Sequence, residues 1–187
     1  MRDRIELSVV IPVFDEEKNL PLLYSRLSPV LKRLKKNYEI IFVDDGSRDS
    51  SFEILKQLGR CDKKIRIVKF RKNFGQTAAL AAGFEQARGE LVATLDADLQ
   101  NDSRDLPMLL KKIEEGYDLV SGWRRRRHDP TSRKIPSIFA NELISCLTGV
   151  RLHDYGCTLK VYRKEGIKNI NLYGEMHRFI QIGRAHV

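Results

Sequence analysis

Cysteine is scarce in this sequence. Its 187 residues include only Cys61, Cys146 and Cys157, which lie far apart and form no Cys-x-x-Cys pair. An odd number of widely spaced cysteines excludes a disulfide framework and argues against a zinc site built from thiolates. We therefore expect inert thiols in a reducing compartment. The four histidines likewise show no spacing that is typical of a metal site.

Long hydrophobic runs and glycine-rich phosphate loops are also absent. No apolar run approaches the ~20 residues that a membrane-spanning helix requires. The run 7–14 is followed by three carboxylates, Asp15–Glu17, and by no cleavage site, which argues against a signal peptide. The chain contains neither G-x-G-x-x-G nor G-x-x-x-x-G-K-[ST]. A dinucleotide-binding fold and a P-loop ATPase are therefore not supported.

What the sequence does contain is a regular alternation of two kinds of segment. Short apolar, β-branched runs predict strands, and stretches with leucine or alanine at helical spacing predict helices. Strands are expected at 7–14, 38–43, 65–70, 91–95 and 117–122, and helices at 20–34, 52–58, 76–88 and 106–115. This order predicts an α/β fold with a mostly parallel sheet, helices on both faces and a single domain. Beyond residue 122, a helix is expected at 135–147 and a strand at 155–162.

Carboxylates follow three of the predicted strands. They are Asp15–Glu16, Asp44–Asp45 and the pair Asp96 and Asp98. Because ligands bind beyond the carboxyl ends of parallel strands, we expect these loops to lie at one edge of the sheet. Asp96 and Asp98 are two residues apart, so on an extended segment both carboxylates face the same way and suit Mg²⁺ or Mn²⁺. The alternative for this pair is a solvated turn.

The segment Asp44–Ser47 allows two interpretations. A carboxylate at a strand end accepts hydrogen bonds from a nucleotide base or ribose. Asp, Gly and Ser are also ordinary turn and helix-capping residues, and Ser47 or Asp49 is a candidate cap of the following helix. A cap at either residue leaves a ligand role for Asp44 or Asp45 open.

The net charge of +9 is concentrated in one segment. Residues 124–134 carry six cationic side chains and one carboxylate, so they hold more than half of this charge. Arginine suits phosphate because its guanidinium is always charged and donates two parallel hydrogen bonds. A solvated basic loop and a nucleic-acid surface are the alternatives. Only Trp123 adjoins the segment with an aromatic ring, and the predicted sheet edge is acidic, so nucleic acid is disfavoured.

Several motifs, in the same order and spacing, resemble one enzyme family. The segments VVIPVFDEEKNL, IIFVDDGSRDSS, RKNFGQTAALAAGFEQARGE and LDADLQNDSRDLP are similar to the family 2 glycosyltransferases with a GT-A fold. The stretch from SGWRRRRHDPTSRKIPSIFANELIS to LYGEMHRFI resembles, more narrowly, the polyprenyl-phosphate glycosyltransferases, which include the dolichyl-phosphate mannose synthase-like enzymes. The likeness covers roughly residues 7–180. It implies a GT-A, Rossmann-like fold.

The resemblance assigns roles to individual residues. Nucleotide-sugar contacts are implied for Pro12, Phe14, Glu16, Asp44, Asp45, Asp96 and Gln100. Metal ligation is implied for Asp96 and Asp98, with Gln100 beside the metal and the diphosphate. Acceptor-phosphate contacts are implied for Arg124, Arg133 and Ser137, and catalytic roles for Asp96, Asp98, Arg124 and Arg133. Phe14 and Asp15 stand where the family more often has Tyr and Asn, so no tyrosine hydroxyl contact is expected there.

The implied function is metal-dependent transfer of a sugar from a nucleotide-diphosphate sugar to an undecaprenyl or dolichyl phosphate. Mg²⁺ or Mn²⁺ is the implied cofactor, and the reaction is an inverting single displacement. The parent protein is expected at the cytoplasmic face of a membrane, with no nucleic-acid partner.

Three alternatives remain open. They are a glycosyltransferase of the same fold with a saccharide acceptor, a sugar-1-phosphate nucleotidyltransferase, and a nucleic-acid-binding α/β domain. A nucleotidyltransferase is expected to begin with a glycine-rich loop, whereas residues 7–19 contain no glycine.

One catalytic domain is expected at residues 1–180, with a nucleotide-sugar half at about 1–100 and an acceptor half at about 101–180. Similar enzymes typically continue after GEMHRFI with further helices. Here QIGRAHV follows, and IGRAHV matches one reading frame of a common sequencing adapter. Residues 181–187 are therefore expected to be a non-native tail on a truncated enzyme.

Overall fold

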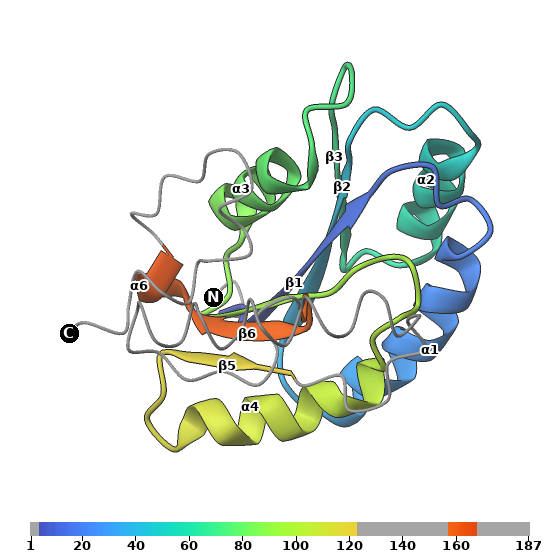
Figure 1. The fold of residues 1–187 in the computed structure, drawn as a ribbon. Helices are drawn as coiled ribbons and strands as arrows, with labels where there is room; N and C mark the ends of the chain where they lie inside the picture. Colours follow the sequence, from blue (N-terminus) through green and yellow to red (C-terminus); the bar gives the residue numbers. More distant parts are fainter. Residues whose placement is uncertain (1–3, 123–156, 168–187) are drawn as a thin grey trace, which may run out of the picture.

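The computed structural model describes residues 4–122 and 157–167 (Figure 1). Strands and helices alternate along the first of these ranges: β1 (Leu7–Val13), α1 (Leu20–Arg33), β2 (Tyr38–Asp44), α2 (Ser51–Cys61), β3 (Ile65–Lys69), α3 (Gln76–Gln86) and β4 (Leu91–Thr94). A short 3₁₀ helix, η1 (Ser103–Asp105), leads into α4 (Leu106–Glu114) and β5 (Leu119–Ser121). The second range holds β6 (Lys160–Arg163) and α6 (Lys164–Ile167).

The strands form one sheet in the order β3-β2-β1-β4-β6-β5. β1 lies parallel to β2 and to β4, and β2 lies parallel to β3. β6 runs antiparallel to both β4 and β5. The expected α/β fold with a mostly parallel sheet is therefore confirmed. The strand order changes direction at β1, and in such sheets ligands bind beside this switch point.

Helices cover both faces of the sheet, as expected. One apolar core contains Val9 and Ile11 of β1 together with leucines of α1, α2 and α4. The opposite core contains Val10 of β1 with Ala79 and Leu80 of α3 and Ile167 of α6. Consecutive β1 side chains thus enter different cores, because side chains alternate across a strand. This explains why β1 is apolar at every position except Ser8, rather than at every second position.

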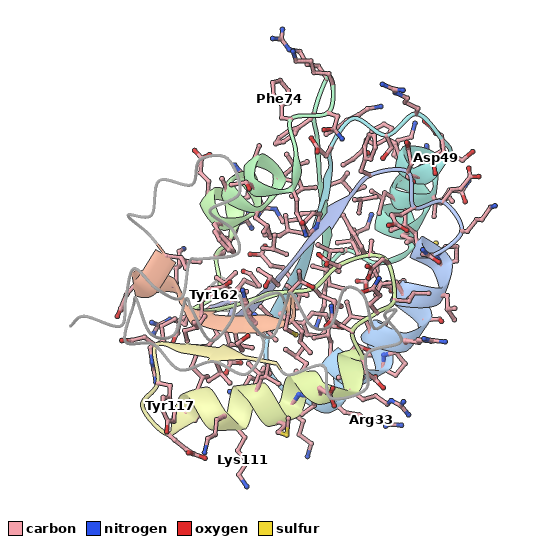
Figure 2. The ribbon with its side chains drawn as sticks, viewed as in Figure 1. Arg33, Asp49, Phe74, Lys111, Tyr117 and Tyr162 are labelled. Atoms are coloured by element: carbon pink, nitrogen blue, oxygen red, sulfur yellow. The ribbon has the colours of Figure 1, made fainter. Side chains whose placement is uncertain are left out.

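Helix α3 packs unusually closely against the sheet. A Cβ atom at Gly83 would lie 2.2 Å from Cγ1 of Val10, so only glycine allows this approach. On the same face, the rings of Phe84 and Tyr162 pack edge to face with centroids 5.5 Å apart. Burial raises the pKa of the Tyr162 phenol. Tyr162 belongs to β6 and lies on the side of this strand that faces α3 (Figure 2). The position of α3 is therefore set by tight contact with β1.

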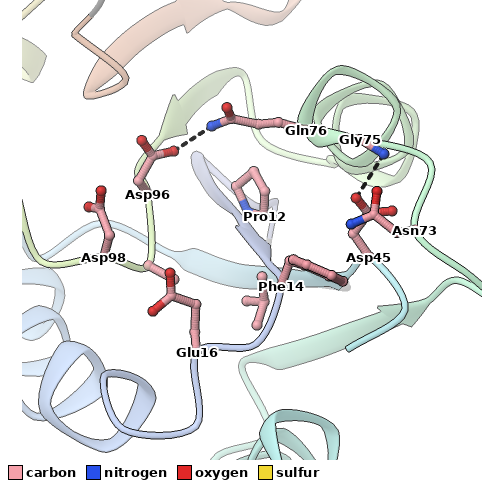
Figure 3. A pocket seen from close by; sticks show the side chains of 11 residues that line it. Pro12, Phe14, Glu16, Asp45, Asn73, Gly75, Gln76, Asp96 and Asp98 are labelled. Atoms are coloured by element: carbon pink, nitrogen blue, oxygen red, sulfur yellow. Dashed lines mark hydrogen bonds between the residues drawn. The ribbon is translucent and has the colours of Figure 1, made fainter. Parts of the chain in front are cut away.

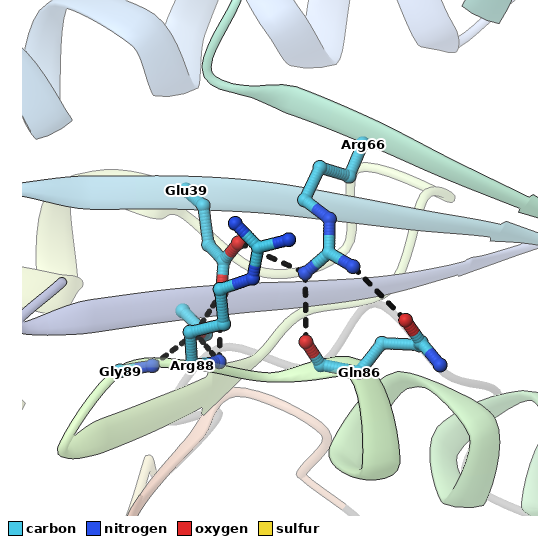
Figure 4. Close-up of polar contacts among 6 residues, drawn as sticks. Glu39, Arg66, Gln86, Arg88 and Gly89 are labelled. Carbon is cyan, nitrogen blue, oxygen red and sulfur yellow. Dashed lines mark hydrogen bonds and ion pairs between the residues drawn. The ribbon is translucent and has the colours of Figure 1, made fainter. Parts of the chain in front are cut away.

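A buried polar network ties α3 to the sheet at the edge opposite the carboxyl ends of the strands (Figure 4). Glu39, at the start of β2, is only 4% exposed. Its Oε1 accepts from Ser8 Oγ at 2.7 Å and from the Arg88 backbone N–H at 2.8 Å. Its Oε2 accepts from Arg66 Nη1 at 3.1 Å, and the same Arg66 atom donates to the Gln86 carbonyl at 2.7 Å. The C-terminal end of α3 is thereby anchored to β1, β2 and β3.

At the end of the sheet that contains β5, the order of the strands differs from their order in the chain. Strand β5 follows β4 in the chain, but β6 lies between them. The expected strand at 117–122 is shorter, at Leu119–Ser121, and the one expected at 155–162 is found at Lys160–Arg163. Residues 155 and 156 and the expected helix at 135–147 lie outside the described residues. None of the described helices is long and apolar enough to cross a membrane.

Candidate active site at the carboxyl edge of the sheet

A pocket of about 310 Å³ opens where β1, β2 and β4 end (Figure 3). It is lined by Pro12, Val13, Phe14, Glu16, Asp45, Asn73, Gly75, Gln76, Asp96, Ala97 and Asp98. Six of the site residues proposed from the sequence belong to this lining: Pro12, Phe14, Glu16, Asp45, Asp96 and Asp98. The three acidic loops thus meet at one edge, beside the switch point of the sheet, as expected.

The end of β1 supplies an aromatic ring and a carboxylate to the pocket. Phe14 is 40% exposed, so its ring is available for stacking. The backbone N–H of Glu16 donates to Ser51 Oγ at 2.8 Å, which joins this loop to the start of α2. Glu16 Oε2 accepts from Asn19 Nδ2 at 2.6 Å. The orientation of the Glu16 side chain is therefore set by the residue that precedes α1.

The two carboxylates at the end of β2 have different surroundings. Asp45 lines the pocket, and its Oδ1 and Oδ2 accept from the backbone N–H groups of Phe74 at 2.7 Å and Gly75 at 2.9 Å. Asp44 is fully buried and does not line the pocket. Its Oδ1 accepts from the Ser47 N–H at 3.0 Å, whereas its Oδ2 has no hydrogen-bond partner among the described residues. Of this pair, Asp45 is placed to touch a ligand in the pocket.

The turn after β2 is packed against the loop between β3 and α3. Gly46 has φ of 73°, and a Cβ atom there would lie 2.4 Å from the backbone carbon of Lys72. Glycine is required both by the conformation and by this approach. Together with the bonds to Asp45, the contact fixes the segment 72–75 beside the pocket.

Asp96 and Asp98 both line the pocket, but not on an extended segment. β4 ends at Thr94, and residues 97–98 lie in a turn that Leu99 completes with φ of 63°. Asp96 Oδ1 accepts from Gln76 Nε2 at 2.7 Å, and Asp98 Oδ1 accepts from the Gln100 backbone N–H at 3.0 Å. The spacing predicts that the two carboxylates face the same way because it assumes an extended backbone. In the structure, a turn instead brings both carboxylates to the same pocket.

The loop after Asp98 is anchored to β6. Asn101 Nδ2 donates to Thr158 Oγ1 at 2.7 Å, and Thr94 Oγ1 donates to the Thr158 carbonyl at 2.6 Å. The chain entering β6 thus holds both the strand before Asp96 and the loop after Asp98. Gln100 itself is exposed and is not part of the pocket lining. Its role beside a metal stays a prediction.

The sequence did not point to five of the lining residues: Val13 and Ala97, which adjoin proposed site residues, and the three residues Asn73, Gly75 and Gln76. All three belong to the segment NFGQ, which joins β3 to α3. The signal was present, because a polar and glycine-containing segment between a strand and a helix faces the same edge as the other strand ends. It was less visible than the acidic motifs, since it carries no charge.

The remaining predicted residues fall elsewhere. Arg124, Arg133 and Ser137 lie outside the described residues, so their acceptor roles stay predictions. Within residues 4–122 and 157–167, no group of three or more His, Cys, Asp or Glu side chains could hold a metal ion. Among the described residues, Asp96 and Asp98 alone do not complete the ligand shell of a cation.

Comparison with known proteins gives the family directly. The model of the family described as Glycosyl transferase family 2 matches residues 8–170. The dodecaprenyl-phosphate galacturonate synthase of Rhizobium johnstonii is 49% identical over 179 residues, which are 94% of this chain and 53% of that protein. The undecaprenyl-phosphate 4-deoxy-4-formamido-L-arabinose transferase of Aeromonas hydrophila is 44% identical over 177 residues, 94% of this chain and 54% of that protein. The chain thus spans about half the length of the curated relatives it matches.

Solved structures show the same fold. A mycobacterial protein superposes with a TM-score of 0.72 at 24% identity, over 96% of this chain and 59% of that one. The glucosyl-3-phosphoglycerate synthase of Mycobacterium tuberculosis, crystallised with Mn²⁺ and uridine-diphosphate-glucose, gives 0.70 at 20% identity, over 90% and 59%. The neighbours have the GT-A fold, and the described strands and helices follow it. From the family match and the two relatives, the chain belongs to glycosyl transferase family 2.

Proposed function

We propose that this chain is the catalytic region of a glycosyltransferase that moves a sugar from a nucleotide-diphosphate sugar to a polyprenyl phosphate. The observation that carries the proposal is the pocket that joins Asp96 and Asp98 to the ends of β1 and β2. The relatives support the acceptor class, because both are named for transfer to a polyprenyl phosphate or for its product. Their names differ in the sugar, so the proposal leaves the sugar open.

The residues present fit a divalent cation. Asp96 and Asp98 offer hard carboxylate oxygens to one pocket, which suits Mg²⁺ or Mn²⁺. Mg²⁺ typically takes one or two carboxylates and completes its shell with waters and substrate phosphates, so two protein ligands suffice. When bound, the cation would neutralise charge on the diphosphate leaving group.

The donor would occupy the pocket between the ends of β1 and β2. The exposed ring of Phe14 offers a stacking surface for a base. Asp45 keeps its carboxylate at the pocket wall through two backbone N–H donors. Each carboxylate oxygen has two lone pairs, so Asp45 remains able to accept from a base or ribose donor.

The acceptor needs little activation. A phosphate monoester has a second pKa of about 6 and is largely dianionic at neutral pH. One of its oxygens attacks the anomeric carbon while the bond to the diphosphate breaks, and the electron pair leaves with the diphosphate. The configuration at that carbon is inverted. Positioning and electrostatic stabilisation carry such a reaction, with Arg124, Arg133 and Ser137 proposed to hold the acceptor phosphate.

The test is the Asp98→Asn variant, assayed by transfer of labelled sugar to a lipid phosphate with Mg²⁺ or Mn²⁺. We expect a loss of about 100-fold or more in turnover, because the variant removes a charge that faces the cation. The matched control is Asp102→Asn in the same loop. Asp102 does not line the pocket, it caps η1, and its pKa is held below the ordinary value by the Arg104 side chain. Full metal-dependent turnover by Asp98→Asn overturns the proposal.

A further inference from the structure

Gln76 makes a contact that joins the two functional sides of the pocket. It is the first residue of α3 and lines the pocket. Its Nε2 donates to Asp96 Oδ1 at 2.7 Å, across 20 residues of sequence (Figure 3). The geometry is complementary, because an amide nitrogen only donates and an ionised carboxylate only accepts.

The bond from Gln76 ties the Asp96 side chain to a different element of the fold. Asp96 is half-buried, lies two residues beyond Thr94, the last residue of β4, and is followed by a turn. Asp98 receives its hydrogen bond locally, from the backbone of Gln100. Asp96 instead receives one from a different element. A hydrogen bond from outside the loop selects one side-chain orientation and removes the entropy cost of selecting it when a ligand binds.

Gln76 is itself held on a fixed support. Asp45 binds the backbone N–H groups of Phe74 and Gly75, immediately before it. Gly83, which lies seven residues further along α3, packs against the side chain of Val10 in β1. The far end of α3 is held by Arg66 Nη1, which donates to the backbone carbonyl of Gln86 at 2.7 Å, a bond that a change of the Gln86 side chain leaves in place. The amide of Gln76 is therefore presented by a helix that is anchored at both ends.

We propose that Gln76 is a positioning residue for Asp96. Its amide keeps the Asp96 carboxylate in the orientation that serves a divalent cation and diphosphate, before either arrives. The inference rests on the proposed function, because it assumes that Asp96 meets such a ligand. Partners that orient metal ligands in this way typically change metal affinity about 10- to 100-fold when removed.

The test compares Gln76→Met with Gln86→Met. Methionine keeps the length of the side chain and removes the donor, and Gln86 is the same residue type at the other end of the same helix. Titration calorimetry measures binding of UDP, GDP and dTDP, each with and without Mn²⁺. We expect Gln76→Met to weaken the Mn²⁺-dependent binding about tenfold and to leave metal-free nucleotide binding and Tm unchanged. Gln86→Met is expected to bind like the wild type.

The outcomes separate the two proposals. Wild-type Mn²⁺-dependent binding that persists in Gln76→Met overturns the positioning role alone. Equal weakening in both variants, or a parallel loss of metal-free binding, assigns Gln76 a merely structural role and also overturns it. A wild-type protein that binds none of the three nucleotides with Mn²⁺ contradicts the proposed function, and the positioning role falls with it. If Gln76→Met does not fold, Gln76→Ala is measured in its place against the same expectation.

Discussion

Glu39 is a buried, charged residue whose hydrogen bonds hold together the edge of the sheet opposite the carboxyl ends of the strands. Its carboxylate accepts one hydroxyl, one backbone N–H and one guanidinium donor, so its desolvation is offset by charge-assisted hydrogen bonds. The backbone of Gly89 also donates to Ser8 Oγ at 2.8 Å, which extends the network toward β4. Replacing one carboxylate oxygen by an amide nitrogen would leave the donors at that oxygen without an acceptor.

We expect Glu39→Gln to lower the free energy of unfolding by about 1–3 kcal/mol, because an unsatisfied buried donor costs that much. Urea unfolding followed by circular dichroism measures the change. The control is Glu53→Gln on α2, where Glu53 is 62% exposed and paired with Lys56 at 2.6 Å. An exposed pair of this kind contributes about 0.3–0.5 kcal/mol. Equal effects of the two substitutions would contradict a special role for Glu39.

At this scale, charged motifs were predictable and hydrogen-bond partners were not. Four acidic residues are recognisable in the sequence because they follow apolar runs, and all four line the pocket: Glu16, Asp45, Asp96 and Asp98. Their partners depend on how α3 packs, which no local pattern states. Asp44 illustrates the difficulty: it adjoins Asp45 and both are buried, yet only Asp45 lines the pocket.

At the scale of elements, the loops after β1 and β2 form one hydrogen-bonded unit. Asp15 adopts φ of 54°, a region that Asp tolerates better than most residues, and its Oδ1 accepts from the Arg48 N–H at 2.7 Å. Asp49 Oδ2 accepts from the Glu17 N–H at 3.0 Å. The reciprocal bond runs from the Ser50 N–H to Glu17 Oε2 at 3.0 Å. The shape of this wall of the pocket thus depends on ionised carboxylates.

Acid should loosen this unit. Burial acts to raise the pKa of Asp49, but hydrogen bonds from Ser51 and from the Glu17 backbone outweigh it and hold this pKa below its ordinary value. A depressed folded-state pKa stabilises the fold above the unfolded value of about 3.9, and this stabilisation is lost as the pH falls through the folded-state pKa. We expect Asp49→Asn to be less stable than the wild type at pH 7, and this difference to shrink as the pH falls below the ordinary carboxyl value of about 3.9. Thermal unfolding measured from pH 7 to pH 2 checks this, and parallel curves for the two proteins would refute it.

Element types were predictable from the sequence, whereas neighbours in the sheet were not. The periodicity of apolar residues identified β1 to β5 and α1 to α4 within a few residues, because each element has to bury one face or both. The insertion of β6 between β4 and β5 depends on contacts between segments that are far apart in the chain. No local pattern encodes that pairing.

At the scale of the whole molecule, acidic and basic groups are separated along the chain. The pocket carries Glu16, Asp45, Asp96 and Asp98, while residues 124–134 hold more than half of the net charge of +9. A cation and two phosphorylated substrates would match this division. The expectation that nucleic acid is not a partner stays a prediction.

We expect Arg133→Ala to raise KM for the lipid phosphate about 10- to 100-fold, because the loss of one charge-assisted hydrogen bond has an effect of this size. KM for the nucleotide sugar is expected to stay nearly unchanged. Steady-state kinetics with each substrate varied in turn measures the split. Arg33→Ala is the control, since Arg33 is exposed at the end of α1, away from the strand ends that form the pocket (Figure 2). Equal changes in both KM values would exclude an acceptor role for Arg133.

The position of β6 also has a consequence for the order in which the chain is made. Synthesis delivers β1 to β4 first. β1 pairs with β2 and β4, and β2 pairs with β3, whereas the other edge of β4 pairs with β6. β5 leaves the ribosome next, but its partner in the described sheet is β6, and residues 122–159 separate the two. About 65 residues separate β4 from β6, so at ~5–20 residues per second translation leaves the outer edge of β4 uncovered for roughly 3–13 s. Throughout that interval the nascent chain presents an open strand edge, the kind of surface on which neighbouring chains aggregate.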